Sequence, residues 1–180
     1  MKHQTHSKAK GLHPAISLMF ILSVACSSIH KTTYTGKGMI FQVTPAFRIG
    51  RSDTTRKNQA TYVPIYCRED VYAKFSVIWV PCLSDLDHEL QIYVDGMTSI
   101  YANDPVNKPV YSEVRTTKFG NNEARQIDYS VLNDGQRVGS YTVFHCDGFT
   151  VIVGQHNSLE GQALANKCRD VIEATYARVN

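Results

Sequence analysis

The chain has 180 residues, with 19 basic and 16 acidic side chains and a formal net charge of +3. Three of the basic residues, Lys2, Lys8 and Lys10, lie within the first ten positions, so the rest of the chain is balanced in charge. A balanced chain disfavours a general electrostatic nucleic-acid binder, and no nucleic-acid partner is expected. The length fits one ordinary domain with a substantial core.

The first 25 residues have the organisation of a secretory signal. A basic start leads into an apolar segment at residues 15–25 that only Ser17 and Ser23 interrupt. This order of charge, apolar core and small residues is typical of a cleaved leader. The apolar segment has about half of the roughly 20 residues that a membrane-spanning helix needs. We therefore predict a signal peptide at residues 1–25 and no transmembrane helix.

Residues 23–26, SVAC, resemble a bacterial lipobox, in which the cysteine receives a diacylglycerol and the chain is cut just before it. Ala25 and Cys26 match that pattern, whereas Ser23 stands where Leu is commoner. We predict lipidation of Cys26, with palmitate-type acyl chains that anchor the protein to a membrane. Ordinary cleavage after Ala25 is the alternative. Ser27 resembles an outer-membrane address in Gram-negative sorting, which places the protein on the periplasmic side.

Residues 26–37 are polar and predict a lipidated N-terminus with a short tether, followed by a single α+β domain at residues 38–180. A short strand is expected at residues 39–43. Runs rich in aromatic and β-branched residues at 61–67 and 74–80 predict a hairpin, because polar residues separate them. The alternation in the second run predicts that both faces of the sheet are partly covered.

A helix is expected next, with Ser84 as its N-cap. Its apolar stripe consists of Leu86, Leu90, Tyr93, Met97 and Ile100. Gly96 weakens the interior of this helix and suggests a close packing contact. The helix should end at Asn103-Asp104-Pro105.

Four strands are expected in the second half, at residues 110–119, 123–132, 136–146 and 149–154. The last three should form an antiparallel meander, because Asn133-Asp134-Gly135 and Asp147-Gly148 supply the positive φ of tight hairpin turns. A terminal helix follows, capped by Ser158. Its apolar stripe consists of Leu164, Cys168, Val171, Ile172, Thr175 and Val179.

Four cysteines remain besides Cys26, namely Cys67, Cys82, Cys146 and Cys168. In an exported domain, four cysteines predict two disulfides with three possible connectivities. A Cys146–Cys168 bond would fix the terminal helix to the meander, but the remaining pair would lie far apart along the first hairpin, so the connectivity stays open. None of the spacings is the short one of zinc ligands, and no metal site is expected.

The segments GMIFQVTPAFRI and NNEARQIDYSVLNDGQRVGSYTVF, together with the order of the expected elements, resemble the PsbP-like fold. That family includes DcrB-type bacterial lipoproteins. The resemblance implies an antiparallel β-sheet meander with two main helices packed on it. The family shares no catalytic residues, so the resemblance implies accessory work, such as docking to a partner or assisting an assembly.

Two groups of residues could instead indicate an enzyme. Asp85, Asp87 and Glu89 surround His88, but acids are also favoured at the start of a helix, and we interpret them in that way. His145 precedes Cys146, but neighbours in a strand point to opposite faces and cannot easily act as base and nucleophile. His156 is interpreted as a solvated loop residue near the terminal helix.

We therefore expect a non-enzymatic, exported bacterial lipoprotein at the periplasmic face of a membrane, with no cofactor and with an unidentified protein partner. The tyrosines are interpreted partly as strand formers and partly as binding anchors. The alternative is a periplasmic ligand-binding protein or a small enzyme with a deep pocket. That pocket would contain His88, His145 or His156 together with nearby acids.

Overall fold

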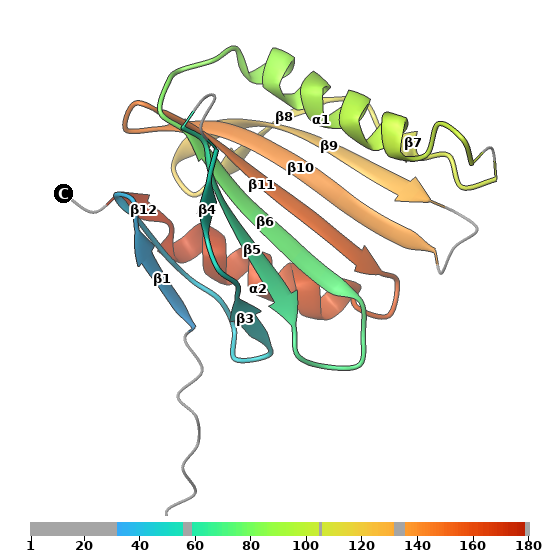
Figure 1. Cartoon of the computed structure of the whole chain (residues 1–180), viewed down its shortest axis with the longest axis horizontal. Coiled ribbons are helices and arrows are strands. Elements are labelled where there is room, and N and C mark those ends of the chain that lie inside the picture. Colours follow the sequence, from blue (N-terminus) through green and yellow to red (C-terminus); the bar gives the residue numbers. More distant parts are fainter. Residues whose placement is uncertain (1–31, 56–58, 105, 132–135, 179–180) are drawn as a thin grey trace, which may run out of the picture.

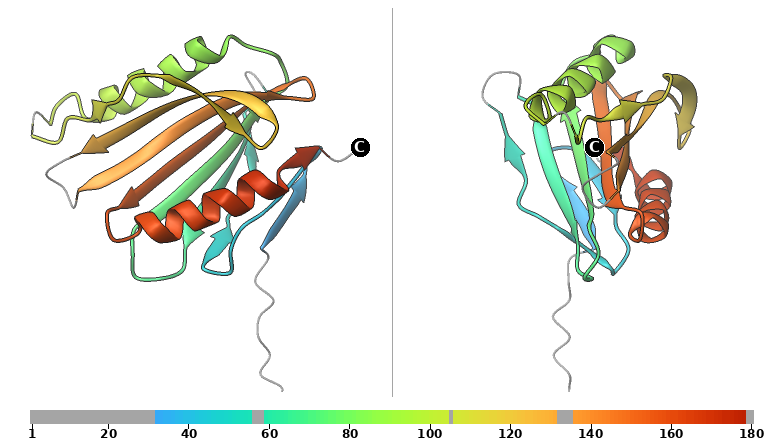
Figure 2. Two further views of the ribbon diagram at one scale, coloured as in Figure 1. Left: turned by 180° about the vertical axis from the view of Figure 1, so that it is seen from behind. Right: turned by 90° about the vertical axis from the view of Figure 1, so that its right-hand side faces the viewer.

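The computed structural model describes residues 32–55, 59–104, 106–131 and 136–178. A large antiparallel sheet carries helix α1 (Leu86–Ile100) on one face and helix α2 (Gln162–Thr175) on the other (Figures 1 and 2). The strand order is β3-β5-β6-β11-β10-β9-β7, with β4 paired to β5 and β8 paired to β9. This arrangement confirms the predicted α+β class.

The main sheet consists of β3 (Phe47–Ile49), β4 (Asp53–Thr54), β5 (Thr61–Cys67), β6 (Ala73–Val80), β7 (Val110–Tyr111), β8 (Arg115–Phe119), β9 (Asn122–Val131), β10 (Arg137–Cys146) and β11 (Phe149–Ser158). A smaller sheet consists of β1 (Thr33–Gly36), β2 (Met39–Gln42) and β12 (Ala177–Arg178). In Figure 1 the small sheet lies beside the C-terminal end of α2.

The small sheet corrects the predicted tether, which extends to residue 37 in the sequence-based interpretation. Strand β1 pairs with β2, and the Tyr34 ring stacks on Phe41 at 5.1 Å between centroids. The same ring meets Trp79 edge-on at 5.6 Å. Burying an aromatic ring of this size stabilises a strand that is otherwise polar. Residues 33–36 therefore belong to the folded domain.

The alternation in β6 divides the core as predicted. Phe75, Val77 and Trp79 are buried in the cluster on the α2 side, whereas Ile78 and Val80 pack into the cluster on the α1 side. Successive strand residues point to opposite faces, so a strand covered on both sides needs apolar residues at nearly every position. The main sheet is accordingly the middle layer of the domain.

The predicted meander is confirmed, and its last strand is longer than expected. Asp147 and Gly148 have φ values of 48° and 85°, which suit the tight turn between β10 and β11. The predicted turn at residues 133–135 lies outside the described residues. Strand β11 continues to Ser158 because it pairs with both β10 and β6. His156 is thus a strand residue and not a loop residue.

The strand predicted at residues 110–119 is divided in two. Tyr111 pairs with Tyr129, and Arg115 pairs with Gln126. Three residues on this side therefore oppose two on β9, which is the geometry of a bulge. The Ser112 hydroxyl accepts a hydrogen bond from the Asp128 backbone N–H at 3.0 Å and holds the bulge in place.

The predicted caps of both helices are one to three residues too early. The N-cap of α1 is Asp85, whose Oδ1 accepts a hydrogen bond from the His88 N–H at 2.8 Å. Ser84 instead donates its N–H to the Thr150 hydroxyl at 2.9 Å. The N-cap of α2 is Gly161, which donates its N–H to the Ser158 hydroxyl at 3.2 Å. Ser158 also donates its N–H to the Tyr72 carbonyl at 2.8 Å, so a tertiary contact engages each predicted serine.

The apolar stripe of α1 is buried at its beginning and exposed at its end. Leu90 is buried, whereas Ile100 is 74% exposed and does not reach the core as predicted. Gly96 has no atom within 4 Å of the position of an added Cβ, so it does not mark the expected packing contact. Neither helix described in this chain has the length and apolarity needed to cross a bilayer.

Candidate functional site

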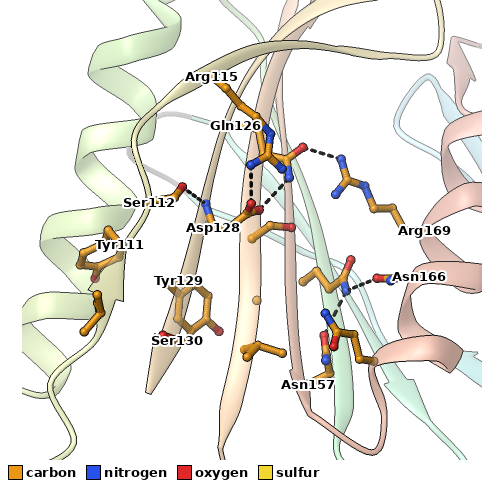
Figure 3. A pocket seen from close by; sticks show the side chains of 16 residues that line it. Tyr111, Ser112, Arg115, Gln126, Asp128, Tyr129, Ser130, Asn157, Asn166 and Arg169 are labelled. Atoms are coloured by element: carbon orange, nitrogen blue, oxygen red, sulfur yellow. Dashed lines mark hydrogen bonds and ion pairs between the residues drawn. The ribbon is translucent and has the colours of Figure 1, made fainter. Parts of the chain in front are cut away.

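A polar groove runs along the face of the main sheet that α2 covers only in part (Figure 3). Its volume is about 610 Å³, and its walls come from β7, β9, β10, β11 and α2. Helix α2 packs mainly on β2, β6 and β11, so the outer strands of the sheet remain open on this side. We call this cavity the polar groove.

The polar character of the groove follows from the alternation of residues in its strands. Ile127 and Tyr129 of β9 belong to the core under α1, so Gln126, Asp128 and Ser130 point into the groove. On neighbouring strands the groove residues are Ser140, Gln155 and Asn157. Polar side chains face the solvent on the part of the main sheet that α2 does not cover. Here they also form a continuous hydrogen-bonding surface.

The charged residues that line the groove are Arg115, Asp128 and Arg169, and the first two form an ion pair. Asp128 receives a hydrogen bond from Arg115 and another from Gln126 Nε2, the latter at 2.8 Å. Arg169 of α2 donates to Gln126 Oε1 at 2.7 Å and to the Thr142 hydroxyl at 3.3 Å. Figure 3 shows Arg169 reaching from the helix towards Gln126. Within the described part of the chain, Arg169 forms no ion pair.

The environment of Arg169 therefore favours an incoming anion. Burial lowers the pKa of its guanidinium, because the charged form is partly removed from water. Both of its hydrogen-bond acceptors are neutral, and Glu173 and Asp128, which raise this pKa, act on the guanidinium through space without a direct ion pair. A partly buried charge is costly until an opposite charge contacts it. An acidic group that enters the groove would supply that charge.

An amide network fixes the other end of the groove. Gln155 donates through Nε2 to Asn157 Oδ1 at 3.0 Å and to Asn166 Oδ1 at 3.1 Å. Asn157 in turn donates to the Ser158 carbonyl at 2.9 Å. The Gln155 Oε1 atom is buried without a partner among the described residues. A buried amide oxygen of this kind is an acceptor for a donor group that enters the groove.

A second cavity of about 340 Å³ lies on the opposite face of the main sheet, beneath α1. Its walls consist mainly of aromatic side chains, namely Tyr62, Tyr72, Tyr93, Tyr101, Tyr129, Tyr141 and His156. We call it the tyrosine pocket. Burial raises the pKa values of Tyr129 and Tyr141, and it raises the pKa of Tyr93 to about 12. These phenols are therefore neutral at ordinary pH.

The structure does not bring the three candidate histidines into one pocket. His156 lines the tyrosine pocket, His88 is exposed on α1, and His145 contacts the Ser84 carbonyl through Nε2 at 2.8 Å. Asp85 caps α1, and Asp87 approaches Arg125 at 3.3 Å. The described residues contain no group of three or more His, Cys, Asp or Glu side chains arranged to hold a metal ion.

The described cysteines are free thiols, so the predicted disulfides are not formed in the structure. Cys67 lies at one end of β5, and the β5–β6 register pairs Tyr66 with Lys74, which leaves Cys82 beyond the other end of this hairpin. Their separation is about 25–30 Å, far beyond the reach of a disulfide. Cys168 is buried against the sheet, as predicted. Cys26 lies outside the described residues.

The sequence-based interpretation missed Arg169 and Gln155. Arg169 falls off the apolar stripe of the terminal helix, and the pattern assigns only that stripe to the sheet. The sequence does contain a signal for the groove. Polar residues occupy alternate positions of β9, β10 and β11, and they share the α2 face of the sheet with apolar core residues of the same strands. A polar surface of that extent beside a core predicts a groove.

Neither a protein-family model nor a curated protein matches the chain. Solved structures resemble it instead. The solution structure of PsbP (CyanoP) from Synechocystis sp. PCC 6803 aligns with a TM-score of 0.55 and 12% identity, over 86% of this chain and 98% of that chain. LpqN, which is involved in cell envelope biogenesis of Mycobacterium tuberculosis, aligns with a TM-score of 0.45 and 11% identity, over 82% and 88%. The fold is PsbP-like, which confirms the predicted fold; the narrower DcrB-type assignment stays a prediction.

Proposed function

We propose that this chain is an exported, lipid-anchored accessory protein of the bacterial cell envelope, which binds a partner protein through the polar groove. The basic and apolar leader and the order of residues 23–26 support export and lipidation of Cys26. Ser27 favours the outer membrane, on its periplasmic side. Strand β1 begins at Thr33, seven positions after Cys26 in the sequence. The groove would therefore work close to the membrane surface.

The observation that carries the proposal is the state of Arg169. Its guanidinium has neutral acceptors on one side and opens into the groove on the other. An acidic side chain or a C-terminal carboxylate of a partner would form a charge-assisted pair with it. Asn166 and Gln162 line the same wall and offer amide groups that match the N–H and C=O groups of an extended peptide. A segment of acidic, polar polypeptide is the occupant with the matching chemistry.

Binding rather than catalysis is also favoured by the state of the reactive side chains. Burial raises the pKa of Cys146, and the carboxylate of Asp147 raises it further. Burial also raises the pKa of Cys168 to about 11. Both thiols are therefore protonated at neutral pH, and a protonated thiol is a weak nucleophile. The protein is accordingly proposed to have no enzymatic activity and no cofactor.

Site-directed photo-crosslinking in the cells that make the protein tests this proposal. A photoreactive benzoylphenylalanine would replace Ser130, which lies on the wall of the groove. A matched variant would carry the same residue at Asp70, which is exposed in the β5–β6 loop. The expected result is one discrete crosslinked protein from position 130 and none from position 70.

A further variant connects the crosslink to the chemistry of the groove. Adding Arg169→Gln to the position-130 variant removes the cation but keeps a polar side chain of similar reach. The crosslink should fall by about tenfold, because a partly buried ion pair is lost. Thermal unfolding of both variants would verify that the domain stays folded. Equal crosslinks from positions 70 and 130, or a crosslink that does not respond to Arg169→Gln, would refute groove binding.

A further inference from the structure

Three side chains that line the tyrosine pocket, Ser76, Tyr141 and His156, meet above Gly154 and form the floor of the pocket. A Cβ added to Gly154 would lie 2.7 Å from the Ser76 hydroxyl, 3.2 Å from the Tyr141 ring and 3.4 Å from His156 Nε2. These three groups therefore fill the space above Gly154, and all three also line the pocket. A larger residue at position 154 would displace them, so the glycine preserves this arrangement.

The polar groups of the floor are oriented as hydrogen-bond donors. His156 Nδ1 is hydrogen-bonded to the Tyr129 hydroxyl. A phenol is the stronger donor of this pair and a neutral imidazole nitrogen the stronger acceptor, so Nε2 carries the ring hydrogen. Burial and the nearby Lys74 lower the pKa of His156 to about 4, which keeps the ring neutral. The Ser76 hydroxyl supplies a second donor beside Nε2.

The pocket also has a positive rim. Lys74 lines it and pairs with His156 across strands β6 and β11. Arg137 lines it as well and lies over the Tyr72 ring at 5.1 Å. The described residues that line the pocket include no carboxylate. Flat aromatic walls, donors at the floor and basic residues at the rim together select both the shape and the charge of an occupant.

We propose that the tyrosine pocket is a second binding site, which takes a small planar aromatic molecule that carries a carboxylate. The aromatic body lies between the tyrosine rings, and the carboxylate accepts hydrogen bonds from His156 Nε2 and Ser76 near the charge of Lys74. The pocket and the polar groove lie on opposite faces of the sheet and share only Tyr129. This site is therefore independent of the proposed partner in the groove.

Calorimetric titration of the purified protein with 2-naphthoate tests the proposal, with 2-naphthalenemethanol as a neutral molecule of nearly the same shape. Wild-type protein should bind 2-naphthoate more tightly than the alcohol. Gly154→Ala should weaken binding of both molecules by about tenfold or more, because the new methyl group would displace Ser76, Tyr141 and His156 from their positions at the floor. Gly96→Ala is the matched control, since its methyl group enters open space on α1.

Lys74→Gln separates charge from shape and keeps the proposal testable if Gly154→Ala unfolds the domain. This substitution should lower the affinity for 2-naphthoate by about fivefold and leave the affinity for the alcohol unchanged. Absence of 2-naphthoate binding to the wild type at millimolar concentration would overturn the proposal. Binding that neither Gly154→Ala nor Lys74→Gln reduces would also overturn it, because the molecule would then occupy another place.

Discussion

Tyr129 of β9 and His156 of β11 form a hydrogen bond across strand β10, at the position of Gly139. The register pairs Gly139 with Tyr129 of β9 on one side and with His156 of β11 on the other. A Cβ on Gly139 would lie 2.6 Å from the Tyr129 ring and 2.1 Å from the Gln155 carbonyl oxygen. The two rings meet because the strand between them carries no side chain at this position.

The buried His156 should make the stability of the domain depend on pH. Its pKa is about 4 in the folded state and 6.5 as the ordinary value, so the unfolded chain binds more protons between these two pH values. The stabilisation is complete above pH 6.5 and is lost as the pH falls towards 4. Over that window, the free energy of unfolding should fall by about 3 kcal/mol more for wild-type protein than for His156→Gln.

Urea unfolding at a series of pH values measures this difference. The control is His88→Gln, because His88 is exposed on α1 and should leave the pH dependence as in the wild type. Carboxylates also titrate in this range, but they do so in all three proteins. Parallel curves for the wild type and His156→Gln would show that the histidine titrates equally in both states.

Two glycine substitutions should change stability in opposite directions. Gly139→Ala should destabilise the domain by about 3 kcal/mol or more, since the methyl group would collide with backbone as well as with the Tyr129 ring. Gly96→Ala should stabilise it by about 0.5–1 kcal/mol, because alanine favours the helix and nothing lies within reach of its methyl group. Chemical unfolding of both variants checks the signs. A Gly139→Ala protein as stable as the wild type would show that the Tyr129 ring does not require a glycine at position 139.

The free thiols should react with alkylating agents at very different rates. Cys82 is exposed at the end of β6, whereas Cys168 is buried and its pKa is raised to about 11. In reduced, native protein at pH 8, iodoacetamide should modify Cys168 about 100-fold more slowly than Cys82. Peptide mass mapping over time measures both rates, and unfolding in urea should remove the difference. Rapid native modification of Cys168 would contradict its burial.

The predicted anchor has a direct signature in the mass of the protein. Membrane-extracted protein should lack residues 1–25 and carry a diacylglycerol on Cys26, together with further acyl chains. The Cys26→Ser variant should leave the membrane fraction. Intact mass, measured with and without reductant, would report the cleavage site, the lipid and the number of disulfides. A product that keeps Met1 and lacks acyl groups would reject both export and anchoring.

Much of the fold is predictable because its strongest signals are local. The alternation of Phe75, Val77 and Trp79 against Ile78 and Val80 reports two covered faces directly. The φ values of Asp147 and Gly148 are the ones that an Asx-Gly turn requires. Signals of this kind depend on a few neighbouring residues, so they can be recognised without the tertiary structure.

The errors arise where a distant partner overrides the local pattern. Ser84 has the chemistry of a cap, but its N–H is engaged by Thr150, and Asp85 takes the role. Strand β1 looks like a tether because only the contact of Tyr34 with Trp79 reveals its burial. Arg169 looks like a surface residue until α2 is placed beside Gln126. The candidate site is made of such long-range contacts, so little of it is visible in the sequence.

The three-stranded sheet gives the C-terminus a protective role. Strand β12 pairs with β2 at Met39 and Ile40, on the side of β2 opposite to β1, and Thr175 accepts a hydrogen bond from the Gln42 N–H at 2.8 Å. An unpaired strand edge is a template for pairing with another molecule. Removing β12 would uncover this edge of β2 and expose it to pairing with another molecule.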